Sequence, residues 1–220
     1  MKIRFRKLRT NLRRALVLAL LILGTPVWTS IITGTAILFA GQIIHFISAG
    51  YLIKKDELIT AGPYKHVRNP FYVGSFLTDC GLCIMAYNPY IPLIWFPLFY
   101  YLVIYGRTLR EEEFLMENFG IRYVEYCKKV PRFLPNISVN TGTEPVTGEF
   151  SYQQLLRHRE IPRVAKALAL TPVFALKMNL LNADFSPGTM AANKENYGLI
   201  AIILLLAIVP GLVFIKKPRP

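Results

Sequence analysis

The sequence has few acidic, few charged and few cysteine residues for a chain of 220 residues. Charged residues make up 18% of the chain and hydrophobic residues 53%, which excludes an intrinsically disordered protein. The cysteines number three, an odd count, and Cys80 and Cys83 lie in one apolar run, which excludes a disulfide framework. The net charge is +13, but the basic residues flank apolar runs, which indicates orientation in a membrane rather than binding of nucleic acid.

Long apolar runs dominate the chain and predict an all-α fold, a polytopic bundle of transmembrane helices. The expected spans are residues 8–24, 27–49, 72–87, 91–105, 164–181 and 198–215. Two turns, Thr25-Pro26 and Asn88-Pro89-Tyr90, make hairpins of the first four spans. Residues 164–181 contain Lys166, Pro172 and Lys177, so they form either a span or an interfacial helix. The sequence therefore predicts five or six spans.

The positions of the basic residues predict the orientation of these spans. Basic residues are concentrated before the first span, in the 52–70 loop and in the 106–135 stretch, and none lies in the 88–90 turn. This pattern predicts a cytoplasmic N-terminus. With six spans the basic tail Lys216-Lys217-Pro-Arg219 also lies inside, whereas with five it lies outside, so six spans are favoured.

Composition divides the chain into three parts. Residues 1–135 form the expected membrane core. Residues 136–150, rich in Thr, Gly, Ser and Pro without an apolar period, form an expected linker. Residues 151–220 form a C-terminal extension with one or two membrane helices.

Two segments rich in polar, aromatic and turn residues, 56–74 and 105–135, lie at the cytoplasmic ends of predicted spans and can meet there. Asp79 is a further candidate, because an acid within a span is costly and usually functional. A hydrogen bond between helices is the alternative role for Asp79.

The two segments carry paired motifs. The first reads Gly62-Pro-Tyr64 and then Arg68-Asn-Pro70-x-Tyr72-x-Gly74; the second reads Glu111-Glu112-x-x-Leu115 and then Phe119-Gly120-x-x-Tyr123-x-x-Tyr126. Together, over about residues 30–135, they resemble the isoprenylcysteine carboxyl methyltransferase and phospholipid methyltransferase family of integral-membrane enzymes, which use S-adenosylmethionine. A soluble-type methyltransferase domain is excluded because no Gly-rich Rossmann loop is present.

The resemblance implies a cofactor pocket at the cytoplasmic face. The residues that it assigns to the cofactor are Leu58, Ile59, Tyr64, Asn69, Pro70, Phe71, Tyr72, Glu111 and Glu112. It assigns Arg107 to the binding of the methyl acceptor, so that Arg107 and Glu111 are the expected catalytic residues. No metal ion is expected in the site. Asn69 departs from the family, which usually has His there; an Asn can hydrogen-bond but cannot carry a proton.

The charges in the second segment allow a simpler interpretation as well. Arg107 and Glu111 are four residues apart on one helical face and can form an ordinary intrahelical ion pair. Three consecutive glutamates repel one another unless a cationic group lies close to them. Glu113 points away from Glu111 and is expected to face solvent.

The expected function is methyl transfer from S-adenosylmethionine to a lipid-like or prenylated acceptor at the cytoplasmic membrane face. O-methylation of a carboxylate is slightly favoured, because a carboxylate is already ionised and needs no base. The alternatives are N-methylation of a phospholipid amine, an NADPH-dependent enzyme of the sterol-reductase kind, and a membrane protein of the same fold without catalysis.

Overall fold

The computed structural model describes residues 2–51, 57–103, 107–136, 147–157, 160–182, 196 and 198–206, and the described part is all-α. Its helices are α1 (Lys2–Leu23), α2 (Trp28–Tyr51), the 3₁₀ turn η1 (Gly62–Lys65), α3 (Pro70–Ala86), α4 (Tyr90–Val103), α5 (Leu109–Phe119), α6 (Ile121–Lys129), α7 (Tyr152–Arg157), α8 (Glu160–Leu168) and α9 (Leu170–Asn182). Residues 198–206 are also helical. The all-α prediction is confirmed.

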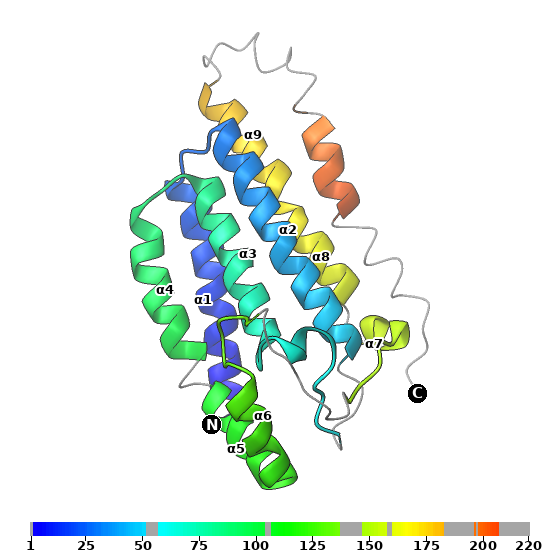
Figure 1. Ribbon diagram of the computed structural model, residues 1–220. Helices are drawn as coiled ribbons and strands as arrows, with labels where there is room; N and C mark the ends of the chain where they lie inside the picture. Colours follow the sequence, from blue (N-terminus) through cyan, green and yellow to red (C-terminus); the bar gives the residue numbers. More distant parts are fainter. Residues whose placement is uncertain are drawn as a thin grey trace.

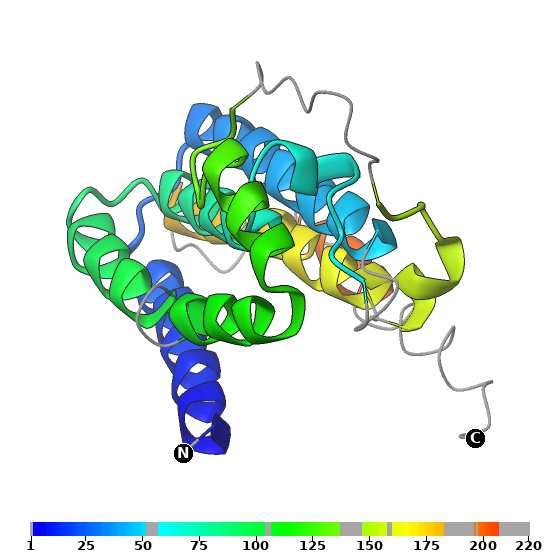
Figure 2. The same cartoon turned by 60° about the horizontal axis from the view of Figure 1, so that its bottom comes forward.

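The long helices lie side by side in one bundle (Figure 1). Helix α3 lies between α2 on one side and α1 with α4 on the other, and α8 and α9 run along α2. One core joins α1, α2, α3, α4 and α9; its fully buried side chains include Leu20, Leu38, Met85 and Phe174. Helices α5 and α6 lie together at one end of the bundle, and the N-terminal turns of α1 extend past that end (Figure 2).

Helices α2 and α3 pack closely through facing glycines. Gly34 and Gly41 on α2 lie against Gly81 and Gly74 on α3, so that a Cβ on Gly34 would be 2.5 Å from the Gly81 oxygen. A Cβ on Gly41 would be 2.6 Å from the Gly74 oxygen. Both pairs are seven residues apart, which keeps them on one face of each helix. Small residues that let backbones approach are typical of helix pairs in membranes.

Local sequence explains where α3 begins and ends. Pro70 is its first residue, where the missing N–H of a proline costs no hydrogen bond, so the helix starts before the predicted position 72. It ends at Ala86 and is capped by Tyr87, a left-handed residue with a φ of 51°. The predicted turn follows: Asn88 Oδ1 accepts hydrogen bonds from the Tyr90 and Ile91 amides, at 3.0 and 3.3 Å, and so caps α4.

Two helical stretches in the described part, Trp28–Tyr51 and Glu160–Asn182, are long and apolar enough to cross a membrane. The second begins four residues before the predicted span of 164–181 and lies beside α2 within the bundle. Lys177 does not extend into solvent: its Nζ donates to the Leu21 and Ile22 carbonyls at the end of α1, at 2.6 and 3.1 Å. A cation there also interacts favourably with the helix dipole. The six-span count and the orientation stay predictions, and the last predicted span is described only over 198–206.

Asp79 is fully buried where α1, α3 and α4 meet. Its carboxylate accepts hydrogen bonds from Arg13, at 2.6 Å from the terminal nitrogen, and from Trp95 Nε1 at 3.2 Å. Both partners lie on neighbouring helices. The structure therefore places Asp79 in the alternative role considered for it, as a polar link between helices.

Candidate functional site

The two motif segments meet at the end of the bundle that carries α5 and α6. Tyr123 and Tyr126 of α6 form a small core with Val130, and Leu58 of the first segment packs against it. The Tyr126 hydroxyl donates to the Tyr64 carbonyl of η1 at 2.6 Å. Burial raises the pKa of the Tyr64 and Tyr126 hydroxyls, and the negative charge of Glu111 raises that of Tyr64 further. The aromatic residues of the second motif therefore hold the first motif in place.

Tyr72, Glu111 and Arg107 form one polar group across the two segments. The Tyr72 hydroxyl donates to Glu111 Oε2 at 2.9 Å. Arg107 Nε donates to Glu111 Oε1 at 2.5 Å, and the guanidinium carbon lies 6.0 Å from the centre of the Tyr72 ring. Burial lowers the pKa of Arg107, but Tyr72 and Glu111 more than offset it, so the pKa is raised and the side chain stays cationic. Tyr72 is buried, whereas Glu111 and Arg107 are about half exposed.

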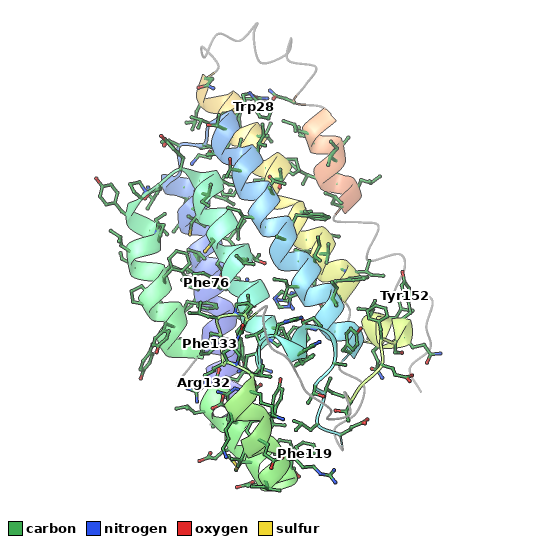
Figure 3. The ribbon with its side chains drawn as sticks, in the orientation of Figure 1. Trp28, Phe76, Phe119, Arg132, Phe133 and Tyr152 are labelled. Atoms are coloured by element: carbon green, nitrogen blue, oxygen red, sulfur yellow. The ribbon has the colours of Figure 1, made fainter. Side chains whose placement is uncertain are left out.

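Glu112 points toward a different pair of cations. Arg132 binds both of its carboxylate oxygens, through Nε at 2.8 Å and a terminal nitrogen at 2.6 Å, and Arg68 donates to Oε1 at 3.0 Å. The expectation that the glutamate run needs a nearby cation is confirmed, as is the exposure of Glu113. Arg132 and Phe133 lie where the α5–α6 end joins the bundle, opposite the end that carries Trp28 (Figure 3).

The other predicted cofactor residues surround the start of α3. Pro70 is fully buried, and Asn69 Nδ2 donates to the Arg132 carbonyl at 3.4 Å. The Phe71 ring lies 5.4 Å from the His45 ring of α2, on a different face of α3 from the Tyr72 contact with Glu111. Ile59 is buried beneath Gly148. The structure thus unites Tyr72, Glu111 and Arg107, and it directs Phe71, Ile59 and Glu112 toward other partners.

Sequence reasoning left Arg68 and Arg132 out of the site, although both hold Glu112. The signal that points to them is the uncompensated charge of the glutamate run, which requires a cation but does not say which one. Phe133, whose ring lies 6.4 Å from that of Tyr72, and Thr147, which binds the 58–61 loop, gave no signal in the sequence.

The geometry sets an anionic and a cationic side chain next to each other at the end of a membrane bundle. Glu111 offers a carboxylate to a ligand with cationic or hydroxyl groups, and Arg107 offers a guanidinium to an anion. Both side chains are accessible, with 40% and 52% of their surface exposed. A ligand can therefore replace the Arg107–Glu111 ion pair, with a cationic group bound to Glu111 or an anionic group bound to Arg107.

Comparisons with known proteins show the family of the chain. The sequence model of the phospholipid methyltransferase family matches residues 13–122. The protein-S-isoprenylcysteine O-methyltransferase of Schizosaccharomyces pombe is 35% identical over 103 residues, 47% of this chain and 43% of that protein. The protein-S-isoprenylcysteine O-methyltransferase B of Arabidopsis thaliana is 34% identical over 125 residues, 55% of this chain and 58% of that protein.

Another relative carries a different name. The nickel-cobalt-cadmium resistance protein NccN of Alcaligenes xylosoxydans xylosoxydans is 28% identical over 134 residues, 57% of this chain and 62% of that protein. The chain spans about half the length of the curated relatives that it matches. No solved structure matches it. The family match covers half of the chain and includes both Tyr72 and Glu111. This chain therefore belongs to the phospholipid and isoprenylcysteine methyltransferase family of membrane proteins.

Proposed function

We propose that this protein transfers a methyl group from S-adenosylmethionine to a lipid-like or prenylated acceptor at the cytoplasmic membrane face. The observation that carries the proposal is the contact of Tyr72 with Glu111, 39 residues apart in sequence, with Arg107 beside both. Tyr72 and Glu111 each come from a motif that resembles the family, Arg107 lies four residues before the second motif, and the fold brings the three together.

The residues present suit this cofactor. When bound, S-adenosylmethionine supplies an electrophilic methyl group on a sulfonium cation. The Glu111 carboxylate would hold a cationic or hydroxyl group of the cofactor, and the Tyr72 hydroxyl orients that carboxylate through its hydrogen bond. The faces of Tyr64 and Tyr72 favour a nearby cation. These residues bind and align, which is the main requirement of a direct displacement.

Arg107 supports an anionic acceptor. Its guanidinium remains charged and half exposed, so it attracts a carboxylate or phosphate and repels an ammonium group. A carboxylate acceptor has a lone pair available at neutral pH and needs no base, whereas an amine must first lose a proton. Asn69, at the position where the family resemblance leads us to expect His, provides no such base. These residues favour O-methylation of a carboxylate.

A phospholipid amine is the second candidate acceptor, because the matching family model is that of the phospholipid methyltransferases. For such an acceptor Arg107 would pair with the phosphate of the head group rather than with the atom that is methylated. The product distinguishes the two reactions: a methyl ester releases methanol in alkali, whereas an N-methyl group is stable.

Cofactor binding is tested by isothermal titration of the detergent-purified protein with S-adenosylhomocysteine and, separately, with NADPH. We expect binding of the first ligand only. Glu111→Gln should weaken that binding by about 1.5–3 kcal/mol, the range for hydrogen bonds to charged groups, or roughly ten- to a hundredfold. Glu117→Gln, on the exposed side of α5, is the matched control and should bind normally. Binding of NADPH alone would refute the proposal and favour the reductase alternative.

The acceptor is identified by incubating native membranes with methyl-labelled S-adenosylmethionine. A labelled lipid or prenylated product, absent with Glu111→Gln, would support the proposal, and alkaline treatment would show whether it is an ester. A protein that binds the cofactor but labels no membrane component would refute the assignment of the acceptor class.

A further inference from the structure

Residues 147–151, here called the strap, cross the loop of residues 58–61. The Thr147 carbonyl accepts hydrogen bonds from the Thr60 and Ala61 amides, both at 3.0 Å. The Thr147 amide donates to Thr60 Oγ1 at 3.0 Å, and the Thr147 hydroxyl donates to the Leu58 carbonyl. The strap lies outside residues 13–122, so the family match assigns it no role.

The far end of the strap is fixed on α2. The Ser151 amide donates to the Gly50 carbonyl at 2.8 Å. The Phe150 ring lies directly over Gly50, where a Cβ would come within 2.2 Å of it, and makes an edge contact with Tyr51 at 5.6 Å between ring centres. Gly148, with a φ of +106°, brings the strap backbone against the Ile59 side chain. The strap is therefore anchored at one end on the loop and at the other end on α2.

The loop depends on these contacts because it has no regular secondary structure of its own. Buried backbone groups need hydrogen-bond partners, and the strap provides them for Leu58, Thr60 and Ala61. The same loop carries Leu58 and Ile59, the residues assigned to the cofactor pocket. It leads directly into η1 and Tyr64, whose pKa is raised first by burial and then by the nearby negative charge of Glu111.

We propose that Thr147 is a positioning residue for the cofactor: through the strap, the end of the segment predicted as a linker fixes the loop to which the family resemblance assigns cofactor contacts. This inference rests on the proposed function. Thr147 acts through the loop and does not touch the cofactor. Thr147→Val is therefore expected to change the affinity for the cofactor but not the affinity for the acceptor, to which the proposed function assigns Arg107, just before α5.

The test compares three variants of the full chain. Thr147→Val keeps the shape and removes the hydroxyl, so the hydroxyl's contacts with the Leu58 carbonyl and with Thr60 Oγ1 are lost, while the backbone hydrogen bonds of Thr147 remain. Thr147→Ser keeps the hydroxyl. Thr171→Val is the matched control, because it removes a Thr–Thr contact of 3.2 Å with Thr35, within the bundle. The measurements are the dissociation constant of S-adenosylhomocysteine, the KM of each substrate and the thermal midpoint.

We expect Thr147→Val to weaken S-adenosylhomocysteine binding about tenfold, the effect of 1.4 kcal/mol, with an unchanged acceptor KM. Thr147→Ser and Thr171→Val should bind like the parent protein. Equal affinity of Thr147→Val and the parent, or an equal loss in Thr171→Val, would overturn this inference while the proposed function stands. A parent protein that binds no S-adenosylhomocysteine would overturn both.

Discussion

The facing glycines of α2 and α3 allow a sharp test of the packing that positions the site. Gly41→Ala adds one methyl group at a point where the helices touch. Its Cβ would lie 2.6 Å from the Gly74 oxygen and 2.8 Å from the Thr78 nitrogen, both of them backbone atoms. Ordinary contact begins at 3.4 Å, so the helices must separate by about 0.8 Å. Gly74 follows Tyr72 by two residues, so the separation also moves Tyr72.

The cost follows from overpacking. Insertion of a methyl group into a tightly packed interface costs about 1–3 kcal/mol. Alanine also favours the helix over glycine by about 0.5–1 kcal/mol, a gain that any helical Gly→Ala change shares. For a chain of 220 residues, 1 kcal/mol corresponds to about 2–4 °C in the thermal midpoint. Relative to a helical glycine in open space, we expect a decrease of about 2–12 °C.

Gly198 supplies that control, because it is helical and a Cβ there meets nothing within 4 Å. Gly41→Ala and Gly198→Ala are compared in one detergent at one heating rate, since membrane proteins often unfold irreversibly and the midpoint then depends on the rate. Gly198→Ala should melt at or above the parent. Equal midpoints for the two variants would refute the close approach of α2 and α3.

Three further predictions test the site and the topology. Glu112→Gln leaves Arg68 and Arg132 without their anion, so we expect it to lower the free energy of unfolding by about 1–3 kcal/mol and to lower the thermal midpoint. Glu113→Gln, at an exposed position, should change that free energy by less than about 0.5 kcal/mol, and equal effects of the two variants would contradict the role of Glu112. Arg107→Lys keeps the charge but loses the planar fork, so it should slow turnover and leave S-adenosylhomocysteine affinity unchanged, and the reverse outcome would exchange the assigned roles. With six spans, a cysteine at Thr189 should react with an impermeant thiol reagent added outside, while one added after Pro220 should not; labelling at the C-terminus alone would establish five spans.

Much of the fold was predictable from local sequence. Apolar runs and the Asn88-Pro89 turn located the helices, because helix formation in these segments depends on length, composition and breakers within the segment itself. The observed bounds differ at α3, which starts at Pro70 because proline suits the first position of a helix, and at α1, which begins at Lys2 instead of at position 8. The linker over 136–150 stays a prediction, and its sequence did not indicate the contacts of the strap, because their partners lie in a loop almost ninety residues earlier.

For the site, the sequence by itself determined the family motifs, the pair Arg107 and Glu111, and the need of the glutamate run for a cation. Only the tertiary structure decided that Arg68 and Arg132 hold Glu112, that Tyr72 binds Glu111, and that Thr147 fixes the 58–61 loop. The physical reason is distance along the chain. A motif reports residue types and helical faces, which are local, whereas partner choice depends on which helices pack together and how closely. Here that choice follows from the glycine contacts of α2 and α3 and the docking of α6 on η1.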